Sequence, residues 1–303
     1  MINNGQNRAV SGVVSDIQRF SLHDGPGIRT TVFFKGCNAR CAWCHNPETL
    51  SMAPEVLVSP GQCIRCGACV GFDETLARQG LPPARDSITP DVVAACFSGA
   101  LRLCGSVMTV QDVMDQILQD RPYYEQSGGG MTASGGECML QRDFLMALLS
   151  ACRDEGIHTA IETNMLYDAG QLKELLPLLD LVMADIKLLD ETAHLRYTGC
   201  SNAHALRGAR RLAQTGIPMI LRTPVIPGVN DSPEDIAAIA QFVANLGGRL
   251  LYYELLNYNP LGGDKYSALG MENPFRDARP LPEERMQALL SAAEQAGIPV
   301  RAG

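Results

Sequence analysis

The sequence of 303 residues predicts an α/β fold: a partial parallel (β/α)6 TIM-like barrel interrupted by a small inserted domain. First, apolar segments of strand length alternate with amphipathic segments from about residue 109 onward, a rhythm typical of parallel strands joined by helices. Second, six such units favour a barrel or partial barrel over an open sheet. Third, the stretch 51–108 breaks the rhythm and is rich in Pro, Gly and Cys. We therefore assign 1–50 and 109–303 to the barrel and 51–108 to the insert.

The individual elements follow from periodicity and from helix-start signals. Val110, Val113 and Ile117 fall on one helical face. Ser232 followed by Pro233 is a typical helix beginning. We expect strands at 30–35, 130–134, 157–163, 181–187, 217–223, 250–256 and 298–302, and helices at 109–120, 142–156, 170–179, 202–216, 232–247 and 282–297.

Composition indicates a globular protein with a sizeable core, since 46% of residues are hydrophobic and 19% charged. The net charge of -8 argues against non-specific nucleic-acid binding, which needs a basic surface. The basic run at 207–211 is expected on a solvated helix face. We see neither a signal-peptide pattern nor an apolar run of the roughly 18 residues that a membrane span needs. We expect a cytoplasmic protein, in which clustered cysteines indicate metal ligands or redox groups.

Polar and glycine-rich segments recur where the predicted strands end. In parallel α/β barrels the chemistry gathers at this edge, where strands end and helices begin. We therefore expect one site built from many loops. The segments are GCNARCAWCHN after the first strand, SGGE at 134–137, ETN at 162–164, DIK at 185–187, RTPVIPG at 222–228 and NYNPLGGDK at 257–265.

The first of these loops holds Cys37, Cys41 and Cys44 with the spacing C-x3-C-x2-C, and no further cysteine follows before Cys63. Structural zinc sites usually combine two C-x2–4-C pairs. The loop is therefore a poor match to a structural zinc site, and a zinc ion is the alternative to an iron–sulfur cluster here. Iron–sulfur clusters in proteins are normally held by cysteine thiolates. Three of them on one loop predict a [4Fe–4S] cluster with one iron open to a non-protein ligand.

This loop, with Trp43 before its third cysteine, resembles the radical S-adenosylmethionine (SAM) superfamily, whose open iron binds the amino and carboxylate groups of SAM. Further segments resemble the glycyl radical enzyme activating enzymes, such as the pyruvate formate-lyase activating enzyme. The likeness covers nearly the whole chain, and the glycine-rich and DGPGIR segments specify the subfamily. These segments are DGPGIRT at 24–30, CHNP after the cysteines, SGGGMTASGGE at 127–137, ADIK at 184–187 and VIPG at 225–228.

The resemblance implies an oxidoreductase of anaerobic metabolism. An external reductant, expected to be a flavodoxin or a ferredoxin, supplies an electron through the cluster to SAM. SAM splits into methionine and a 5′-deoxyadenosyl radical, which removes hydrogen from a glycine Cα of a partner glycyl radical enzyme. One alternative is a radical SAM enzyme that acts directly on a small molecule or peptide, and another is a non-catalytic ferredoxin-like electron carrier. The long motif matches argue against the first, and the open coordination site and large barrel against the second.

The resemblance also places residues near the adenosyl group of SAM, each beside a structural alternative. Trp43 is expected to lie against the adenine, and the alternative is that it packs in the core. His45 and Asn46 are expected to approach the adenosyl group, and the alternative is that they only stabilise the loop. Asn259 stands where relatives often carry His, and it cannot titrate near neutral pH, so we expect no proton relay there. Asp24 meets the glycyl loop of the partner unless it forms a plain turn.

The end of the second predicted strand is expected to contact the methionine end of SAM. Gly135 and Gly136 allow a close backbone approach to a ligand. Glu137 could accept hydrogen bonds from the methionine ammonium, or serve only as an acid at a helix start. We expect Cys138, where relatives have proline or alanine, to be a free thiol, and Cys152 to be a buried apolar residue.

The next three strand ends carry charged residues that match those of relatives. Glu162 and Thr163 resemble an acidic–Thr pair, and Asp185 and Lys187 resemble a D-x-K motif. In relatives some of these groups hold a monovalent cation or contact the methionyl carboxylate and ribose. We expect Lys187 and the three cysteines to form the catalytic set. Surface salt bridges are the alternative, and Arg222 is either a site residue or a structural partner at the sheet edge.

The insert carries a second cysteine pattern. Cys63, Cys66 and Cys69 have the spacing C-x2-C-x2-C, which begins the bacterial ferredoxin motif. We predict a ferredoxin-like insert with one auxiliary [4Fe–4S] cluster completed by a remote cysteine, with zinc as the alternative. The segment CFSGAL at 96–101 resembles the end of ferredoxin motifs and favours Cys96 over Cys104 as that ligand.

Overall fold

The chain forms a nine-stranded sheet in the order β11-β10-β9-β8-β7-β6-β2-β1-β5, in a computed structural model that describes residues 7–72, 82–83 and 88–303. The strands from β2 to β11 in this order run parallel, whereas β1 pairs antiparallel with both β2 and β5. The predicted α/β class with a parallel sheet is therefore confirmed. The strands are β1 Ser11–Ser21, β2 Arg29–Phe34, β5 Ser106–Thr109, β6 Gly130–Gly135, β7 His158–Thr163, β8 Leu181–Asp185, β9 Met219–Val225, β10 Leu250–Asn257 and β11 Val300–Ala302.

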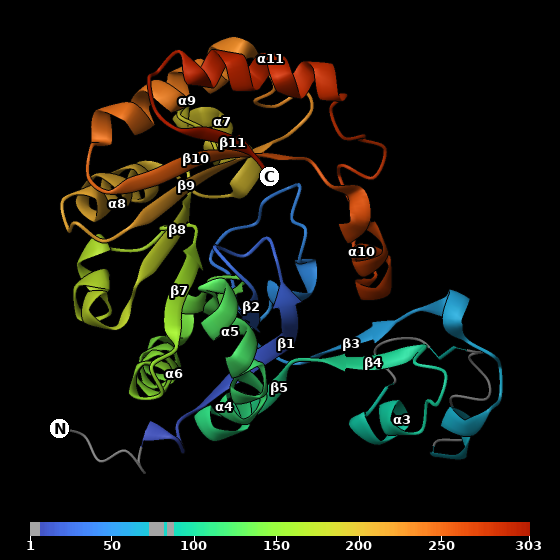
Figure 1. Cartoon of the computed structure of the whole chain (residues 1–303). Coiled ribbons are helices and arrows are strands. Elements are labelled where there is room, and N and C mark those ends of the chain that lie inside the picture. The colour runs from blue at the N-terminus through green and yellow to red at the C-terminus, as the bar shows by residue number, and fades with distance from the viewer. Residues whose placement is uncertain (1–6, 73–81, 84–87) are drawn as a thin grey trace.

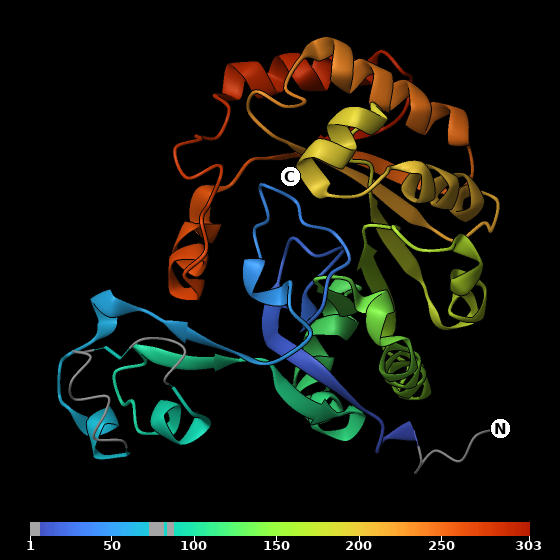
Figure 2. The ribbon, with the colours of Figure 1, turned by 180° about the vertical axis from the view of Figure 1, so that it is seen from behind.

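The longer helices pack on one face of this sheet, its outer side in both views (Figures 1 and 2). The loop that follows β2 lies on the inner side. The predicted helix start at Ser232 is confirmed, because its hydroxyl accepts the N–H of Asp235 and Pro233 occupies the first turn. The helices of the main body are α4 Val110–Ile117, α5 Arg121–Ser127, α6 Arg142–Asp154, α7 Glu191–Thr198, α8 Ala203–Ala213, α9 Pro233–Leu246, α10 Gly263–Leu269 and α11 Glu283–Glu294.

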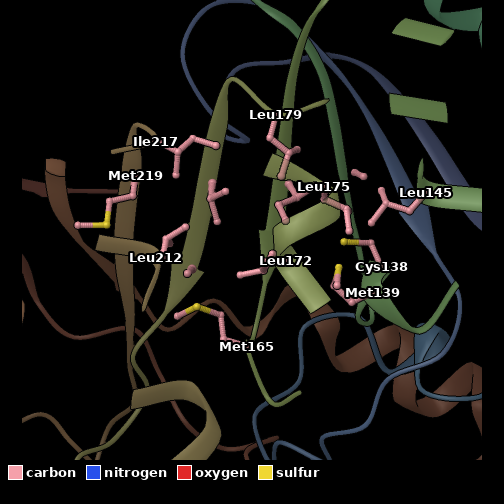
Figure 3. Close-up of a cluster of buried hydrophobic side chains, with 14 of the residues drawn as sticks. Cys138, Met139, Leu145, Met165, Leu172, Leu175, Leu179, Leu212, Ile217 and Met219 are labelled. Carbon is pink, nitrogen blue, oxygen red and sulfur yellow. The ribbon is translucent and has the colours of Figure 1, made fainter. Parts of the chain in front are cut away.

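Side chains of the central strands alternate between the two faces of the sheet, as the strand period of two requires. The outward-facing ones, such as Ile161 and Leu221, join the helices in one large core. Figure 3 shows part of this core, where Leu145 and Leu212 approach the sheet and Cys138 lies buried among them. Cys138 and Cys152 are both free and buried, as predicted. The inner face is left for other side chains, several of them charged.

The structure corrects one prediction of secondary structure and contains a long strand that the sequence did not indicate. The expected helix at 170–179 is wrong, because 3-10 turns at Ala169–Glu174 and Leu176–Leu178 take its place. Pro177 lies inside that segment, and its missing N–H and its ring oppose an α-helix. The long strand β1 was not predicted, because its half-exposed sequence SGVVSDIQRFS shows no continuous apolar run. Among the described residues, no helix has the length and hydropathy needed to cross a bilayer.

The segment between β2 and α4 contains a separate two-stranded antiparallel sheet, which extends to one side of the main body in Figure 1. Leu57 and Cys104 of this sheet pack against Ala268 and Leu269 of α10. Strand β5 straddles the predicted boundary at 108 and pairs with β1 in the main sheet. The elements are β3 Glu55–Val58, β4 Leu101–Cys104, α3 Pro90–Ala94 and 3-10 turns at Pro60–Gln62 and Ala68–Phe72. The predicted insert also includes 73–81 and 84–87, which lie outside the described residues.

Candidate functional site

The three-cysteine loop leaves β2 at Gly36 and is held by backbone hydrogen bonds on two sides. The Gly36 N–H donates to the carbonyl of Thr49 (2.7 Å), and the Arg40 N–H donates to the carbonyl of Thr198 (2.7 Å). Gly36 has φ of 94°, a conformation that glycine adopts without strain. The loop is therefore a fixed part of the structure, anchored to the turn after it and to the end of α7.

The thiols of Cys37, Cys41 and Cys44 line a cavity of about 350 Å³. Burial raises the pKa of Cys37 to about 11 and that of Cys44 to about 12, and it also raises the pKa of Cys41. As free groups these thiols are protonated, and binding a metal releases their protons. Among the described residues, no three His, Cys, Asp or Glu side chains converge as ligands of a single metal ion. Three thiols on one loop suit the separate corners of an iron–sulfur cluster better.

Almost all the residues predicted from the strand ends meet at this one cavity. Its volume lies within the usual range for small-molecule sites, and it opens on the inner face at the carboxyl edge of the parallel strands. Glu137 is the one predicted SAM-site residue that does not line it. The predicted residues that do are Cys37, Cys41, Trp43, Cys44, His45, Asn46, Gly135, Gly136, Glu162, Thr163, Asp185, Lys187, Arg222 and Asn259.

Glu137 is instead fully buried behind the cavity wall. Its carboxylate accepts the N–H groups of Met139 (3.1 Å) and Asn164 (2.8 Å) and the hydroxyl of Thr163 (3.0 Å). Burial raises the pKa of Glu137 to about 7, although these hydrogen bonds act in the opposite direction. The geometry matches the alternative of an acid at a helix start and leaves no oxygen facing a ligand.

The glycines before Glu137 are required by close packing of the backbone. A Cβ atom on Gly135 would lie 2.3 Å from the backbone of Phe34, and one on Gly136 would lie 2.2 Å from the carbonyl oxygen of Gly36. Gly135 also has φ of 112°. Larger residues would push the end of β6 away from the cysteine loop, so these glycines bring the two segments together.

Lys187 and Asp185 form an ion pair at the end of β8, with 2.5 Å between Nζ and Oδ2. Burial alone would lower the pKa of Lys187, but the charge of Asp185 outweighs it and the net shift is upward. Lys187 is therefore a fixed cation beside the three thiols. Only 10% of its side chain is exposed, so a carboxylate that enters the cavity would meet a positive charge that is poorly screened by water.

Arg222 links three strands on the inner face. Its guanidinium hydrogen-bonds to Glu162 of β7 and pairs with Glu254 of β10, where Nε lies 2.9 Å from Oε2. It also donates to the carbonyl oxygen of His23 (3.0 Å). The second oxygen of Glu162 accepts the hydroxyl of Ser134 (2.5 Å). Arg222 is thus a structural partner that also lines the cavity, which combines the two predicted alternatives.

Trp43 closes one side of the cavity and is only 8% exposed. Its ring lies 6.1 Å from Tyr197 and 6.2 Å from Phe275, and Tyr258 packs in the same group. Both predicted roles are therefore compatible with its position, since one part packs in a small aromatic core and another part faces the cavity. An aromatic wall of this kind suits the flat apolar face of a base.

His45 and Asn46 follow the last cysteine of the loop. Lys265 of α10 donates to Oδ1 of Asn46 (2.7 Å) and to the carboxylate of Glu48 (2.6 Å). Burial and the charge of Lys265 lower the pKa of His45, which favours its neutral form. Helix α10 therefore fixes the carboxyl end of the cysteine loop.

Asp24 does not line the cavity. Its carboxylate accepts the hydroxyls of Ser21 (2.5 Å) and Thr31 (2.6 Å), and its carbonyl accepts the hydroxyl of Thr132 (2.8 Å). These contacts hold the DGPG segment against β2 and β6, which matches the structural alternative for Asp24.

The cysteines of the insert form a second group. Cys63, Cys66, Cys69 and Cys96 line a small cavity of about 20 Å³. Cys104 lies elsewhere, buried at the end of β4, where its thiol donates to the carbonyl oxygen of Glu48 (3.8 Å). The structure thus brings together the four cysteines that the sequence grouped and separates Cys104 from them.

Several residues of the main cavity were not predicted. Asn164 and Asn257 belong to the strand-end segments ETN and NYN, so a signal for them was present. The same signal was present for Ala39, Ser134, Pro224, Ile226 and Tyr258, which also belong to the listed segments, whereas Thr49, Leu50, Met183 and Leu256 lie outside them. The residues missed are Ala39, Thr49, Leu50, Ser134, Asn164, Met183, Pro224, Ile226, Leu256, Asn257 and Tyr258.

Comparison with known proteins supports the chemistry of this geometry. The sequence profile of the Radical SAM superfamily matches residues 31–243, which include the three-cysteine loop and most of the sheet. The chain belongs to the radical SAM superfamily. A [4Fe–4S] cluster and SAM are the cofactors that this superfamily implies, as the sequence predicted.

Within the superfamily the chain is similar to activating enzymes. It is 38% identical over 285 residues to the (2S)-3-sulfopropanediol dehydratase activating enzyme of Klebsiella oxytoca, with 90% of each chain covered. It is 40% identical over 301 residues to the isethionate sulfite-lyase activating enzyme of Nitratidesulfovibrio vulgaris, with 95% and 97% covered. The benzylsuccinate synthase activating enzyme of Thauera aromatica is 36% identical, with 96% and 92% covered. The predicted glycyl radical enzyme activating family is confirmed, and it is favoured over direct action on a small molecule.

Two solved structures are similar to this chain. A domain of the pyruvate-formate lyase-activating enzyme from Bacteroides vulgatus is 28% identical with a TM-score of 0.50, and the match covers 58% of this chain and 99% of that domain. QueE from Escherichia coli matches over 99% and 98% of the two chains with a TM-score of 0.54 at 13% identity, which shows a shared fold alone.

Proposed function

We propose that this radical SAM protein activates a partner glycyl radical enzyme, with the cluster on Cys37, Cys41 and Cys44 and SAM in the adjoining cavity. The observation that carries the proposal is that three thiols of one loop and a fixed lysine, Lys187, face the same cavity. When bound, the cluster and SAM supply an adenosyl radical that removes hydrogen from a glycine Cα of the partner. The protein binds and orients these groups and excludes competing reactions.

The residues of the cavity suit the two ends of SAM. Lys187 offers a charge-assisted hydrogen bond to the methionyl carboxylate, while Trp43 and His45 offer apolar and aromatic surface to the adenine. The resemblance implies that some of the residues Glu162, Thr163, Asp185 and Lys187 hold a monovalent cation or contact SAM. Two of them, Glu162 and Asp185, are carboxylates. Each already has a cationic partner, Arg222 or Lys187, so charge balance does not require the cation, and it stays a prediction.

For the insert we propose an auxiliary [4Fe–4S] cluster on Cys63, Cys66, Cys69 and Cys96. Their shared small cavity supports Cys96 over Cys104 as the remote ligand. We likewise propose that 51–108 forms a ferredoxin-like domain and that 1–50 and 109–303 form a partial barrel. Cys66 is exposed, so a cluster there would lie near the surface, within reach of a flavodoxin or ferredoxin. The clustered thiols suit a reducing compartment such as the cytoplasm.

The activation itself can be tested by anaerobic electron paramagnetic resonance (EPR). The reduced protein is mixed with SAM and a candidate partner glycyl radical enzyme, and a glycine-centred doublet is expected together with SAM cleavage. The Cys41→Ala variant should give neither signal, since it removes one thiolate of the proposed cluster. SAM cleavage without a doublet would contradict the activase proposal and support direct action on another substrate.

A further inference from the structure

The side chain of Asn164 reaches the first cysteine of the loop. Its amide Nδ2 lies 3.7 Å from Sγ of Cys37, within the hydrogen-bond range for sulfur, and 2.9 Å from Oδ1 of Asn38. The backbone N–H of Ala39 donates to the same sulfur at 3.4 Å. Asn164 is 8% exposed and lines the main cavity. Cys37 therefore receives one N–H from its own loop and one from a residue 127 positions away.

The amide of Asn164 is held in this orientation by its own turn. Its Oδ1 accepts the N–H of Leu166 (2.8 Å), so its oxygen and nitrogen each have defined partners. Met165 between them has φ of 53°, a conformation that is strained for a residue with a side chain and persists only where the surroundings impose it. The turn therefore aims the N–H groups of Asn164 at the cysteine loop.

The backbone of the same turn is anchored by the buried carboxylate behind the cavity wall. Glu137 accepts the Asn164 N–H at 2.8 Å, and the hydroxyl of Thr163 accepts the N–H of Met165 at 3.0 Å. Glu137 therefore has a structural function although it does not line the cavity. It fixes the residue that reaches the sulfur.

We propose that Asn164 is a positioning residue whose amide holds Cys37 and stabilises the reduced state of the cluster that Cys37 binds. This inference rests on the proposed role of Cys37 as a ligand. Reduction adds negative charge that is shared with the cysteine sulfurs, and an N–H donor at such a sulfur favours the more negative state. Hydrogen bonds to the sulfurs are among the factors that set cluster potentials.

The test is the midpoint potential of the SAM-site cluster, measured by anaerobic EPR titration without SAM. This cluster is identified as the one whose signal changes when SAM is added afterwards. Asn164→Leu keeps a similar volume and removes the donor. We expect its reduction equilibrium constant to fall about fivefold, or roughly 40 mV toward negative potential at 59 mV per tenfold change. Asn164→Asp should shift further in the same direction, because it also adds a negative charge.

Tyr167→Phe is the matched control. The hydroxyl oxygens of Thr163 and Tyr167 lie 3.0 Å apart, so this change removes a hydrogen bond near the same turn without touching the sulfur. Its potential should equal that of the unaltered protein. Equal shifts in Asn164→Leu and Tyr167→Phe, or no shift in Asn164→Leu at full iron content, would overturn the inference. If Cys37→Ala keeps the SAM-responsive signal, the proposed function fails as well, so the two failures are distinguishable.

The unaltered protein provides a second measurement in case the Asn164 variants do not fold. Protein labelled with ¹⁵N in the asparagine side-chain amides is reduced without SAM and measured by pulsed EPR. A ¹⁵N coupling to the SAM-site cluster is expected, because the Asn164 amide reaches Sγ of Cys37. Asn38 directs its own amide to the carbonyl of Leu166 (2.8 Å), and none of the hydrogen bonds of the described residues joins Asn46, Asn257 or Asn259 to that sulfur. Absence of this coupling would overturn the inference.

Discussion

Replacing Arg222 by methionine should destabilise the protein strongly, because it leaves two carboxylates on the inner face of the sheet without their shared cation. The side chains of Arg222, Glu162 and Glu254 are 8%, 21% and 13% exposed. Burial already raises the pKa of Glu162 despite the neighbouring guanidinium. Removing one partner of a buried ion pair typically costs about 3–5 kcal/mol. The residual exposure of the two glutamates favours the lower end, about 3 kcal/mol.

The assay is equilibrium urea unfolding of Arg222→Met under anaerobic conditions, followed by circular dichroism. Arg153→Met is a matched control, because Arg153 pairs with Asp180 at 3.3 Å on the surface, where the two side chains are 42% and 37% exposed. Surface pairs contribute about 0–1 kcal/mol, so this control should change the free energy of unfolding little. Equal effects of the two substitutions would refute the argument from burial.

The double variant Arg222→Met/Glu162→Gln separates charge from packing. Removing the Glu162 charge as well should recover part of the lost stability, because only Glu254 then lacks a cation. Residues in one ion-pair network commonly show coupling energies of about 0.5–3 kcal/mol. Simple addition of the two single effects would indicate that the loss came from altered packing around the methionine.

Three further predictions concern the site and the insert. Burial raises the pKa of Glu137 from 4.5 to about 7, so the folded state holds its proton more tightly than the unfolded state does. Urea unfolding should therefore show the free energy of unfolding falling by about 3 kcal/mol as the pH rises from 4.5 to 7. The Glu137→Gln variant should lack this contribution to the pH dependence. Lys187→Met should weaken SAM binding about 10- to 100-fold by calorimetry, the value of one charge-assisted hydrogen bond, and unchanged affinity would place the carboxylate elsewhere. Cys96→Ala should lower the iron content from about eight to about four per chain while Cys104→Ala should not, and the reverse would exchange the two ligands.

The parts of the site that sequence could predict are those encoded by short spacing. The C-x3-C-x2-C loop places three thiols on one segment whatever the rest of the chain does. The strand ends DIK and RTP were predictable because parallel strands end at a common edge. Trp43 shows the limit, since its sequence position beside Cys44 does not reveal that Tyr197 and Phe275 enclose its ring.

The parts that sequence could not predict depend on which side of a turn becomes buried. Glu137 has the chemistry of a ligand, but the 3-10 turn at Cys138–Gln141 directs its carboxylate to the backbone of Asn164. Asn164 belongs to the strand-end segment ETN at 162–164, but the residue it contacts, Cys37, lies 127 positions away in the sequence. No local pattern encodes either contact, because both depend on how the ends of β2, β6 and β7 pack together.

The charged residues inside the sheet show how a local pattern and a long-range one combine. Strands of a parallel sheet that are covered on both faces are nearly continuous apolar runs, and β8 and β9 follow this rule except at Asp185, Arg222 and Thr223. The period of two assigns each exception to one face of its own strand. It does not fix their alignment, because the helix between two parallel strands leaves their register free.

That register decides the function of the inner face. Arg222 lies directly opposite Asp185 on one side and Glu254 on the other. A shift of one residue in β9 would turn Arg222 toward the helices and leave the glutamates unpaired. The apolar outer face sets the register through the helices packed on it, and the same packing therefore aligns the charges that line the cavity. In this protein the stability of the outer core and the geometry of the site are determined together.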